Sequence, residues 1–170
     1  MQVLETKRLI LRHLCIDDAG FIIQLLNEPS FIRHIGDKGV CTGEDAKQYL
    51  LSGPIDSYDR FGYGLNMVEL KKSGEPIGMC GLVRREDLDD ADIGFAMLEQ
   101  HWSKGYAAES AEAVMRHARK TLNLQRIVAI VAPDNRSSIR LLEKIGLTFE
   151  RMIRRIDDDK ELKFFVSDAQ

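Results

Sequence analysis

The residues with the clearest chemical capacity lie in the stretch EQHWSKGYAAES, residues 99–110. A strand-like segment, ADIGFAML (91–98), precedes it, and a run of small, helix-favouring residues follows. The first backbone N–H groups of a helix have no partner inside the helix, and the helix dipole adds about half a positive charge there. Gly105 would let a ligand approach that backbone without meeting a Cβ atom. The pattern predicts an anion site on the N–H groups of Ser103–Ala108, with Lys104 adding a full charge, and phosphate or pyrophosphate is the candidate anion.

Taken alone, the same stretch also fits a plain connection between a strand and a helix, because glycine is common in such turns. Two nucleotide-binding motifs are excluded by spacing. A Walker loop needs G-x-x-x-x-G-K-[ST], whereas Lys104 precedes Gly105 here and no second glycine is in place. The dinucleotide motif G-x-G-x-x-G is absent, since Tyr106 and Ala107 follow the single glycine.

A carboxylate lies shortly before the loop, at Asp92. In an alternating strand Asp92 shares one face with Gly94, Ala96 and Leu98, so small neighbours leave room for a substrate beside it. A carboxylate in this position could accept a proton as a general base. It also ends the acidic turn REDLDDAD (85–92), and an ordinary surface carboxylate is the alternative interpretation.

The elements expected to position these residues are a strand, short helices, three strands, a long helix, a strand, a helix and a closing hairpin. Their expected ranges are 8–14 for the first strand, 17–29 and 42–53 for the short helices, 63–70, 75–83 and 91–98 for the three strands, 105–123 for the long helix, 126–132 for the next strand, 135–146 for the last helix and 147–167 for the hairpin. Alternation of strand and helix in the second half implies at least one parallel strand pair inside an otherwise antiparallel sheet. The fold class is therefore α/β, of the α+β type.

Capping and breaking residues set the limits of the early helices. Asp17 is expected to cap the first helix, which Pro29 ends. Thr42 with Asp45 three positions later resembles a capping box, and Gly53–Pro54 is expected to close that second helix.

The whole-chain composition excludes several classes of protein. The chain has 170 residues, of which 44% are hydrophobic and 30% charged, as in an ordinary soluble globular domain. Its formal charge of -3 argues against nucleic acid as the main partner. Cys15, Cys41 and Cys80 lie far apart, which favours reduced cytoplasmic thiols and offers no metal cluster. No segment has the apolar length of a membrane span. We expect a single cytoplasmic domain, residues 1–170, with no metal, nucleic acid or membrane as partner.

Four segments, in order, resemble one family. WSKGYA (102–107) resembles the [QR]-x-x-G-x-[GA] pyrophosphate loop of the GNAT N-acetyltransferases, with Trp102 in place of the usual Gln or Arg. ETKRLILR (5–12), ADIGFAML (91–98) and APDNRSSIRLLEKIGLTFE (132–150) are similar to segments of the RimJ/RimL-like branch, the ribosomal-protein N-terminal acetyltransferases. The last segment departs from the pattern only in having Leu where Phe is usual. The resemblance covers nearly the whole chain.

The resemblance implies a GNAT fold: a mixed, mostly antiparallel sheet with a splayed parallel pair, flanked by helices. It implies acetyl-CoA as cosubstrate, with the pantetheine arm hydrogen-bonded to backbone around Met97 and Leu98. Asn135 would bond the same arm, and its other interpretation is an N-cap for the next helix, a role that one residue can combine with binding. The pyrophosphate would lie on the backbone of six residues, namely Ser103, Lys104, Gly105, Tyr106, Ala107 and Ala108.

The implied activity is transfer of an acetyl group to a primary amine by direct attack in a ternary complex. An amine is mostly protonated at neutral pH, so a base must take a proton. Asp92 lies where many GNAT enzymes carry a catalytic Glu, and its shorter side chain favours a bridging water. Leu142 stands where many GNAT enzymes carry a Tyr that acts as the general acid. Relatives in the RimJ/RimL-like branch use the serine of the N-x-x-S element for this role, so Ser138 is the predicted acid. Ser138 could equally satisfy backbone in the first helical turn, and a thiolate can also leave without an acid.

The acceptor is expected to be a peptide or protein N-terminus or a small amine. Acidic turns at 86–92 and 157–159 suggest a cationic acceptor, unless both are ordinary solvated turns. The alternative function is a non-catalytic acyl-CoA-binding sensor or regulatory protein. Homodimers are common in the family, so a second copy of the chain is a further expected partner.

Overall fold

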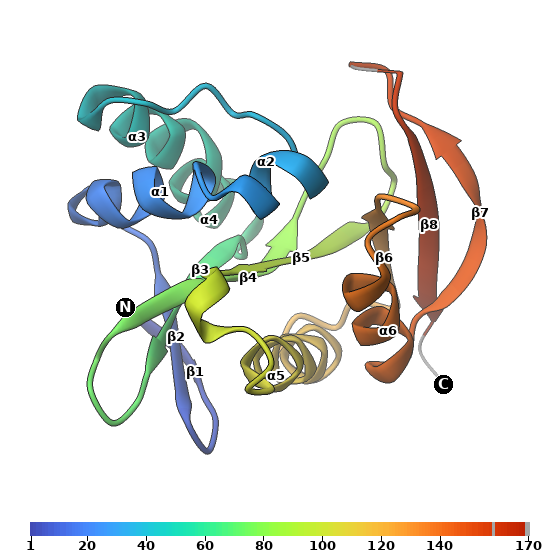
Figure 1. Cartoon of the computed structure of the whole chain (residues 1–170). Helices are drawn as coiled ribbons and strands as arrows, with labels where there is room; N and C mark the ends of the chain where they lie inside the picture. The colour runs from blue at the N-terminus through green and yellow to red at the C-terminus, as the bar shows by residue number, and fades with distance from the viewer. Residues whose placement is uncertain (158, 169–170) are drawn as a thin grey trace.

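One eight-stranded sheet organises the chain, in the order β1-β2-β3-β4-β5-β6-β8-β7 (Figure 1). The computed structural model describes residues 1–157 and 159–168. The predicted strands are all present, and the first of them is preceded by an additional short strand. Their bounds are β1 Gln2–Glu5, β2 Leu9–His13, β3 Leu65–Leu70, β4 Pro76–Val83, β5 Ala91–Met97, β6 Arg126–Val131, β7 Thr148–Arg154 and β8 Glu161–Asp168.

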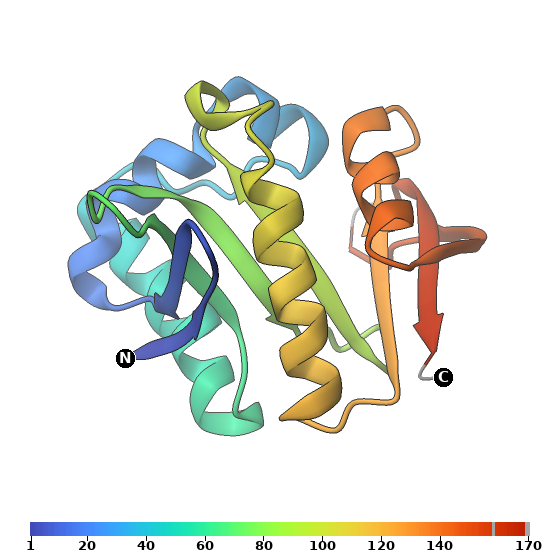
Figure 2. The same cartoon turned by 90° about the horizontal axis from the view of Figure 1, so that it is seen from below.

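Helices cover both faces of this sheet (Figures 1 and 2). The helices on one face are α1 (Ala19–Leu26), α2 (Pro29–His34), α3 (Gly43–Leu50) and α4 (Asp56–Phe61), and those on the other are α5 (Tyr106–Lys120) and α6 (Arg136–Lys144). A buried cluster that includes Met67, Met79 and Leu98 lies beneath the first group. A second cluster, which includes Ile77, Ile93 and Phe165, lies on the α5 side. Two apolar layers thus enclose the sheet.

The long helix α5 forms as its sequence predicts. Ala111, Val114 and Ala118 recur at helical spacing, and all three are buried against the sheet. The segment has no internal glycine or proline, and its alanines favour helix. The predicted long helix is confirmed, and α5 begins directly after Gly105.

The early helices depart from the expected limits at two prolines. Pro29 does not end a helix but opens α2, because a proline is tolerated in the first turn, where its missing N–H would have no partner. Pro54 lies inside a π-helical turn, Leu51–Ile55, that joins α3 to α4, and the helical run ends at Gly62. A 3₁₀ turn, Ile16–Asp18, precedes α1, so Asp17 does not cap it. The capping box of Thr42 and Asp45 is confirmed.

The parallel pair of β5 and β6 opens after two residue pairs. Ala91 pairs with Ile127 and Asp92 with Val128, whereas β5 stays paired with β4 as far as Met97. Beyond residue 92, the β6 side of β5 therefore has no neighbouring strand. The expected splayed parallel pair is confirmed, and its opening lies at the carboxyl ends of the two strands, where ligands bind in open α/β sheets.

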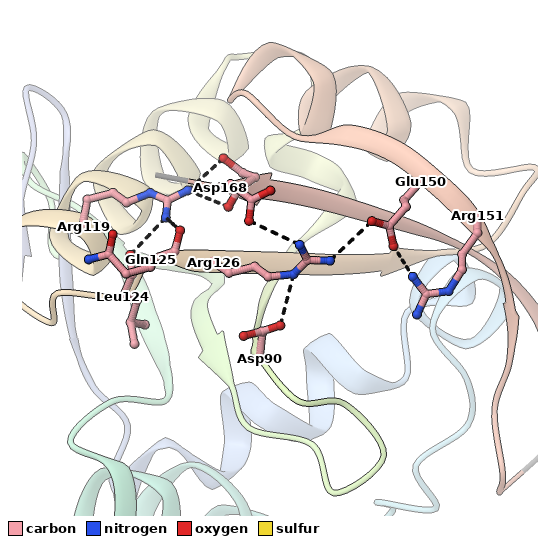
Figure 3. Close-up of polar contacts among 9 residues, drawn as sticks. Asp90, Arg119, Leu124, Gln125, Arg126, Glu150, Arg151 and Asp168 are labelled. Atoms are coloured by element: carbon pink, nitrogen blue, oxygen red, sulfur yellow. Dashed lines mark hydrogen bonds and ion pairs between the residues drawn. The ribbon is translucent and has the colours of Figure 1, made fainter. Parts of the chain in front are cut away.

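The opposite end of this pair is held by a cluster of arginine contacts (Figure 3). Arg126, the first residue of β6, forms ion pairs with Asp90 (3.2 Å), Glu150 (3.4 Å) and Asp168 (3.3 Å). Arg119 of α5 donates to the backbone oxygens of Leu124, Gln125 and Ser167. These contacts fasten β6 to its neighbours at the end where the sheet remains closed.

Candidate active site

The opening between β5 and β6 forms a cleft of about 430 Å³, within the range typical of small-molecule sites. Its walls come from α2, the end of β5, the loop 101–105, the first turn of α5 and helix α6. The cleft brings together most residues predicted to bind a cofactor, although they lie far apart in the sequence. Those in its lining are Met97, Ser103, Gly105, Tyr106, Ala107, Ala108 and Asn135.

The loop before α5 presents unpaired backbone amides. Gly105 is the N-cap residue and has a left-handed φ of 81°, and Ser103 is also left-handed, at 62°. Among the described residues, the N–H groups of 103–108 have no hydrogen-bond partner. A Cβ atom at Gly105 would lie 3.2 Å from Nη2 of Arg8. Orphan amides at the start of a fifteen-residue helix fit an anion, which is the property that the sequence predicted.

This loop is clamped from behind by the turn between β1 and β2. Nε of Arg8 lies 2.7 Å from Oε2 of Glu109, and its Nη1 donates to the carbonyl oxygen of Lys104 at 2.9 Å. Thr6 donates to Glu109 at 2.6 Å. Burial opposes the ionisation of Glu109, but the hydrogen bonds from Thr6 and Arg8 outweigh it and lower the pKa. Sequence reasoning assigned no role to these residues, although the segment ETKRLILR contains two of them.

Trp102 ties the loop to the end of β5. Its indole Nε1 donates to the carbonyl oxygen of Met97 at 2.9 Å, and about half of the side chain is exposed. The amide of Leu98 donates to Ile77 of β4, and its side chain is buried outside the cleft. Because strand polar groups alternate in direction, the backbone of Phe95 and Met97 faces the opening instead. Phe95, which sequence reasoning missed, lines the cleft.

Asn135 caps α6 and also faces the cleft. Its Oδ1 accepts from the backbone N–H of Ser138 and from the hydroxyl of Ser137, each at 3.3 Å. Among the described residues its Nδ2 has no partner. The capping role is thus present, and the amide nitrogen is available to a ligand in the same cleft.

Helix α6 supplies the positive side chains of the cleft. Arg140 and Lys144 are part of its lining, whereas Lys104 and Arg136 are exposed and outside it. The sequence predicted that Lys104 adds positive charge to the anion site. Within the cleft, the positive charge comes instead from Arg140 and Lys144, which lie one turn apart on α6.

The two predicted catalytic residues occupy different environments. Ser138 lines the cleft, and its hydroxyl has no partner among the described residues. Asp92 is 1% exposed and lies outside the linings of the cleft and its neighbouring cavity. Its Oδ2 accepts from Nε of Arg85 at 2.5 Å. Burial raises the pKa of Asp92, and the charge of Arg85 opposes that shift.

A second cavity, of about 540 Å³, adjoins the cleft across β5. The two share Phe31 of α2, Ile35 directly after α2, and Phe95 and Ala96 of β5. Gly94 and Ala96 were predicted to lie on one face of the strand and to leave room for a substrate. Both line the second cavity. A group held in the cleft can therefore meet a group held in the second cavity at residues 95–96.

The acidic turn after β4 is largely neutralised by arginines. Asp87 pairs with Arg155 at 2.6 Å, Asp90 with Arg126, and Asp92 with Arg85. Within the other acidic turn, 157–159, residue 158 lies outside the described residues. Three carboxylates of the turn at 86–92 are thus paired, whereas Glu86 and Asp89 are exposed and form no ion pair among the described residues.

Two further searches concern only residues 1–157 and 159–168. No group of three or more His, Cys, Asp or Glu side chains there could hold a metal ion. None of the helices there has both the length and the apolar character to cross a bilayer.

A protein-family model described as the acetyltransferase (GNAT) domain matches residues 8–148. The uncharacterized N-acetyltransferase p20 of Bacillus licheniformis is 29% identical over 166 residues, covering 94% of this chain and 90% of p20. YkkB of Bacillus subtilis is 35% identical over 98 residues, and this match spans 55% of the chain and only 57% of YkkB.

Solved structures show the same arrangement of strands and helices. An acetyltransferase from Agrobacterium tumefaciens superposes with a TM-score of 0.82 at 29% identity, covering 98% of this chain and 93% of that one. RimL, described as a ribosomal L7/L12 alpha-N-protein acetyltransferase in complex with coenzyme A, gives a TM-score of 0.82 at 18% identity, with 99% and 98% covered. The family match includes β5, the loop before α5, and α6, which together line the cleft.

Proposed function

The chain belongs to the GNAT family of acetyltransferases, and from this we propose that it transfers the acetyl group of acetyl-CoA to a primary amine. The observation that carries the proposal is the row of unpartnered amides at 103–108, which opens onto a cleft between two splayed strands. Backbone amides at a helix start suit a pyrophosphate, and the exposed backbone of β5 suits an amide-containing arm.

Different residues of the cleft would bind different parts of acetyl-CoA. The amides of 103–108 would hold the pyrophosphate, with Arg140 and Lys144 adding positive charge. The backbone of Phe95 and Met97 and the Nδ2 of Asn135 would bond the pantetheine arm. Acetyl-CoA supplies an activated thioester. The acetyl end would then lie near residues 95–96, where the second cavity gives access to an amine.

Proton transfer is assigned to two positions. Ser138 lines the cleft and would return a proton to the departing sulfur. Asp92 stays the predicted base, and the geometry allows this role only through a bridging group or water, because the carboxylate is buried behind Arg85. The amine must lose a proton in either case, since its pKa lies well above neutral.

The RimJ/RimL-like branch and direct attack in a ternary complex belong to the same proposal. Four ordered sequence segments and the RimL-like fold support the branch. The proposed acceptor is a peptide or protein N-terminus or a small amine. The competing proposal, an acyl-CoA sensor without turnover, rests on the absent tyrosine at Leu142 and the buried position of Asp92.

Calorimetric titration with acetyl-CoA tests the proposed loop directly. We expect wild type to bind with a dissociation constant on the order of micromolar, and Gly105→Trp to lose that binding because its side chain fills the anion site. Gly74→Trp is the matched control, since Gly74 has a similar φ of 75° and open space around it in a distant turn.

The two outcomes separate the alternatives. Absence of binding to wild type, or equal loss in both variants, would contradict the loop assignment. Acetyl-CoA binding without CoA release over a broad amine panel would favour the sensor.

A further inference from the structure

The second cavity contains an arginine that is anchored from behind. Arg85 lines this cavity with its side chain 29% exposed, and its Nε donates to Asp92 at 2.5 Å. The side chain of Asp92 is 2% exposed, and Asp92 belongs to the lining of neither cavity. A buried carboxylate that accepts from Nε fixes the direction of the guanidinium group.

The remaining part of that guanidinium is available to a ligand. Among the described residues, neither terminal nitrogen of Arg85 has a hydrogen-bond partner. Two such nitrogens present parallel N–H donors at the spacing of a carboxylate, which permits a bidentate contact. Tyr49, whose hydroxyl also has no partner among the described residues, lines the same cavity and can donate beside it.

The charges around the cavity are unequal in sign. Four cationic side chains belong to its lining, those of Lys38, Arg60, Arg84 and Arg85, against two carboxylates, those of Asp56 and Glu86. Asp56 is already paired with Arg60 at 3.1 Å. The loop that carries Arg85 is held by the pair of Asp87 and Arg155, so the arginine is mounted on a fixed segment.

We propose that Arg85 binds a carboxylate of the acceptor, so that the acceptor is a small amine that also carries a carboxylate, such as an amino acid. This inference rests on the proposed function. The amine would lie toward the wall shared with the cleft, at Phe95 and Ala96, and the carboxylate toward Arg85. A guanidinium fork can bind either a carboxylate or a phosphate. The carboxylate is preferred because Glu86 belongs to the same lining and would repel a dianion more strongly than a monoanion.

This proposal replaces the cationic acceptor that the acidic turns suggested. It also gives Asp92 a role as a positioning residue, acting through Arg85. The two roles of Asp92 differ in a measurable way. Loss of a base lowers kcat for every amine, whereas loss of positioning raises KM only for amines with a carboxylate.

Acetylation of matched amines tests the inference, with CoA release as the readout. The panel pairs free amino acids with their amides, and adds O-phosphoethanolamine, ethanolamine and spermidine. We expect wild type to favour each free acid over its amide by roughly tenfold or more in kcat/KM, as a charged hydrogen-bonded contact provides.

Arg85→Gln is expected to reduce that preference to near one and to leave the dissociation constant of acetyl-CoA unchanged. Because this variant leaves Asp92 buried without its partner, the double variant Arg85→Gln with Asp92→Asn is measured beside it, and thermal unfolding checks that both are folded. Asp92→Asn alone should raise KM for the acids by more than it raises KM for the amides, because only the acids use the contact with Arg85. Arg151→Gln removes an exposed arginine outside both cavities and should keep the full preference.

Three results would overturn the inference. Amides or spermidine accepted by wild type as readily as free acids would exclude carboxylate recognition while leaving the acetyltransferase intact. A preference for O-phosphoethanolamine over the amino acids would replace the carboxylate with a phosphate. An unchanged preference for the free acids in Arg85→Gln would show that Arg85 does not bind their carboxylate. Failure of the proposed function itself is separate, since it appears as absent acetyl-CoA binding in the calorimeter.

Discussion

At the scale of single residues, two adjacent serines of α6 differ in what their hydroxyl groups do. Both serines line the cleft, but Ser137 donates to Asn135, whereas the hydroxyl of Ser138 has no partner among the described residues. A hydroxyl without an internal partner is free to exchange a proton with a ligand. The difference makes Ser138 testable against its own neighbour.

Ser138→Ala is expected to lower kcat by roughly 100-fold, the lower range for general acid catalysis, with little change in acetyl-CoA affinity. Steady-state kinetics and calorimetry measure the two quantities. Ser137→Ala is the control and should keep kcat within about threefold. Equal kcat values in wild type and Ser138→Ala would assign this serine to the helix turn alone.

The carboxylate of Glu109 predicts a pH-dependent contribution to stability. Its pKa in the fold lies below its ordinary value of 4.5. The ionised form therefore stabilises the fold fully above about pH 4.5, and this contribution is lost as the pH falls through the lower, folded-state pKa. Glu109→Gln should lower the free energy of unfolding by about 1 kcal/mol at pH 7, and the difference should vanish in acid.

Urea denaturation from pH 3 to 8 measures that difference. Glu112→Gln is the control, because Glu112 lies on the same helix and has no hydrogen bond or ion pair among the described residues. Parallel curves for the two variants would count against the clamp. Weaker acetyl-CoA binding in Glu109→Gln alone would tie the clamp to the loop.

Sequence reasoning found residues whose roles are local. Gly105 and Asn135 follow from a left-handed turn and a helix N-cap, which depend on a few neighbouring positions. Arg8 and Glu109 are 101 positions apart, and only the packing of the first hairpin on α5 brings them together. Strand alternation predicted that Asp92 shares a face with Gly94 and Ala96, but it could not show that Arg85, from the turn after β4, covers the carboxylate.

At the scale of elements, apolar periodicity accounts for most of the fold. Strands β2 to β8 and helix α5 were predicted because their patterns need no distant information, whereas β1 was not predicted. The run from α3 to α4 was not, since Pro54 ordinarily stops a helix. Here a wider π turn accommodates the proline, and burial of Leu50 and Pro54 maintains the helical direction. Both helices contribute residues to the lining of the second cavity. The incorrect prediction of the helix limits therefore concerned a wall of the proposed acceptor site.

At the scale of the whole molecule, the site exists because the sheet is closed at one end and open at the other. The pattern RIVAIVA identified β6 as a buried strand, but nothing in it tells where pairing with β5 stops. The splay was expected from family resemblance and not from periodicity. The arginine cluster around Arg126 marks the closed end (Figure 3).

Arg126→Ala tests how much that cluster holds the sheet together. The side chain is 37% exposed, so solvent screens its ion pairs, and we expect a loss of about 1 kcal/mol in unfolding free energy. Acetyl-CoA affinity should change less than about threefold, because the cluster lies outside the cleft. Chemical denaturation and calorimetry measure both. Arg151→Ala removes one exposed ion pair with Glu150 and a contact with the ring of Phe164, and it should cost less stability than Arg126→Ala. An equal loss in the two variants would contradict a particular role for Arg126.

The donor side of this protein is built mainly from main-chain groups, and that has a consequence for how the chain tolerates change. Side chains at 103–108 can vary while the amides keep their directions, so an alanine scan of the loop would find few sensitive positions. The proposed acceptor side would depend instead on individual side chains such as Arg85 and Tyr49. Related chains could therefore diverge in the amines they accept while preserving a common donor, and a change of acceptor would need only a few substitutions in one wall.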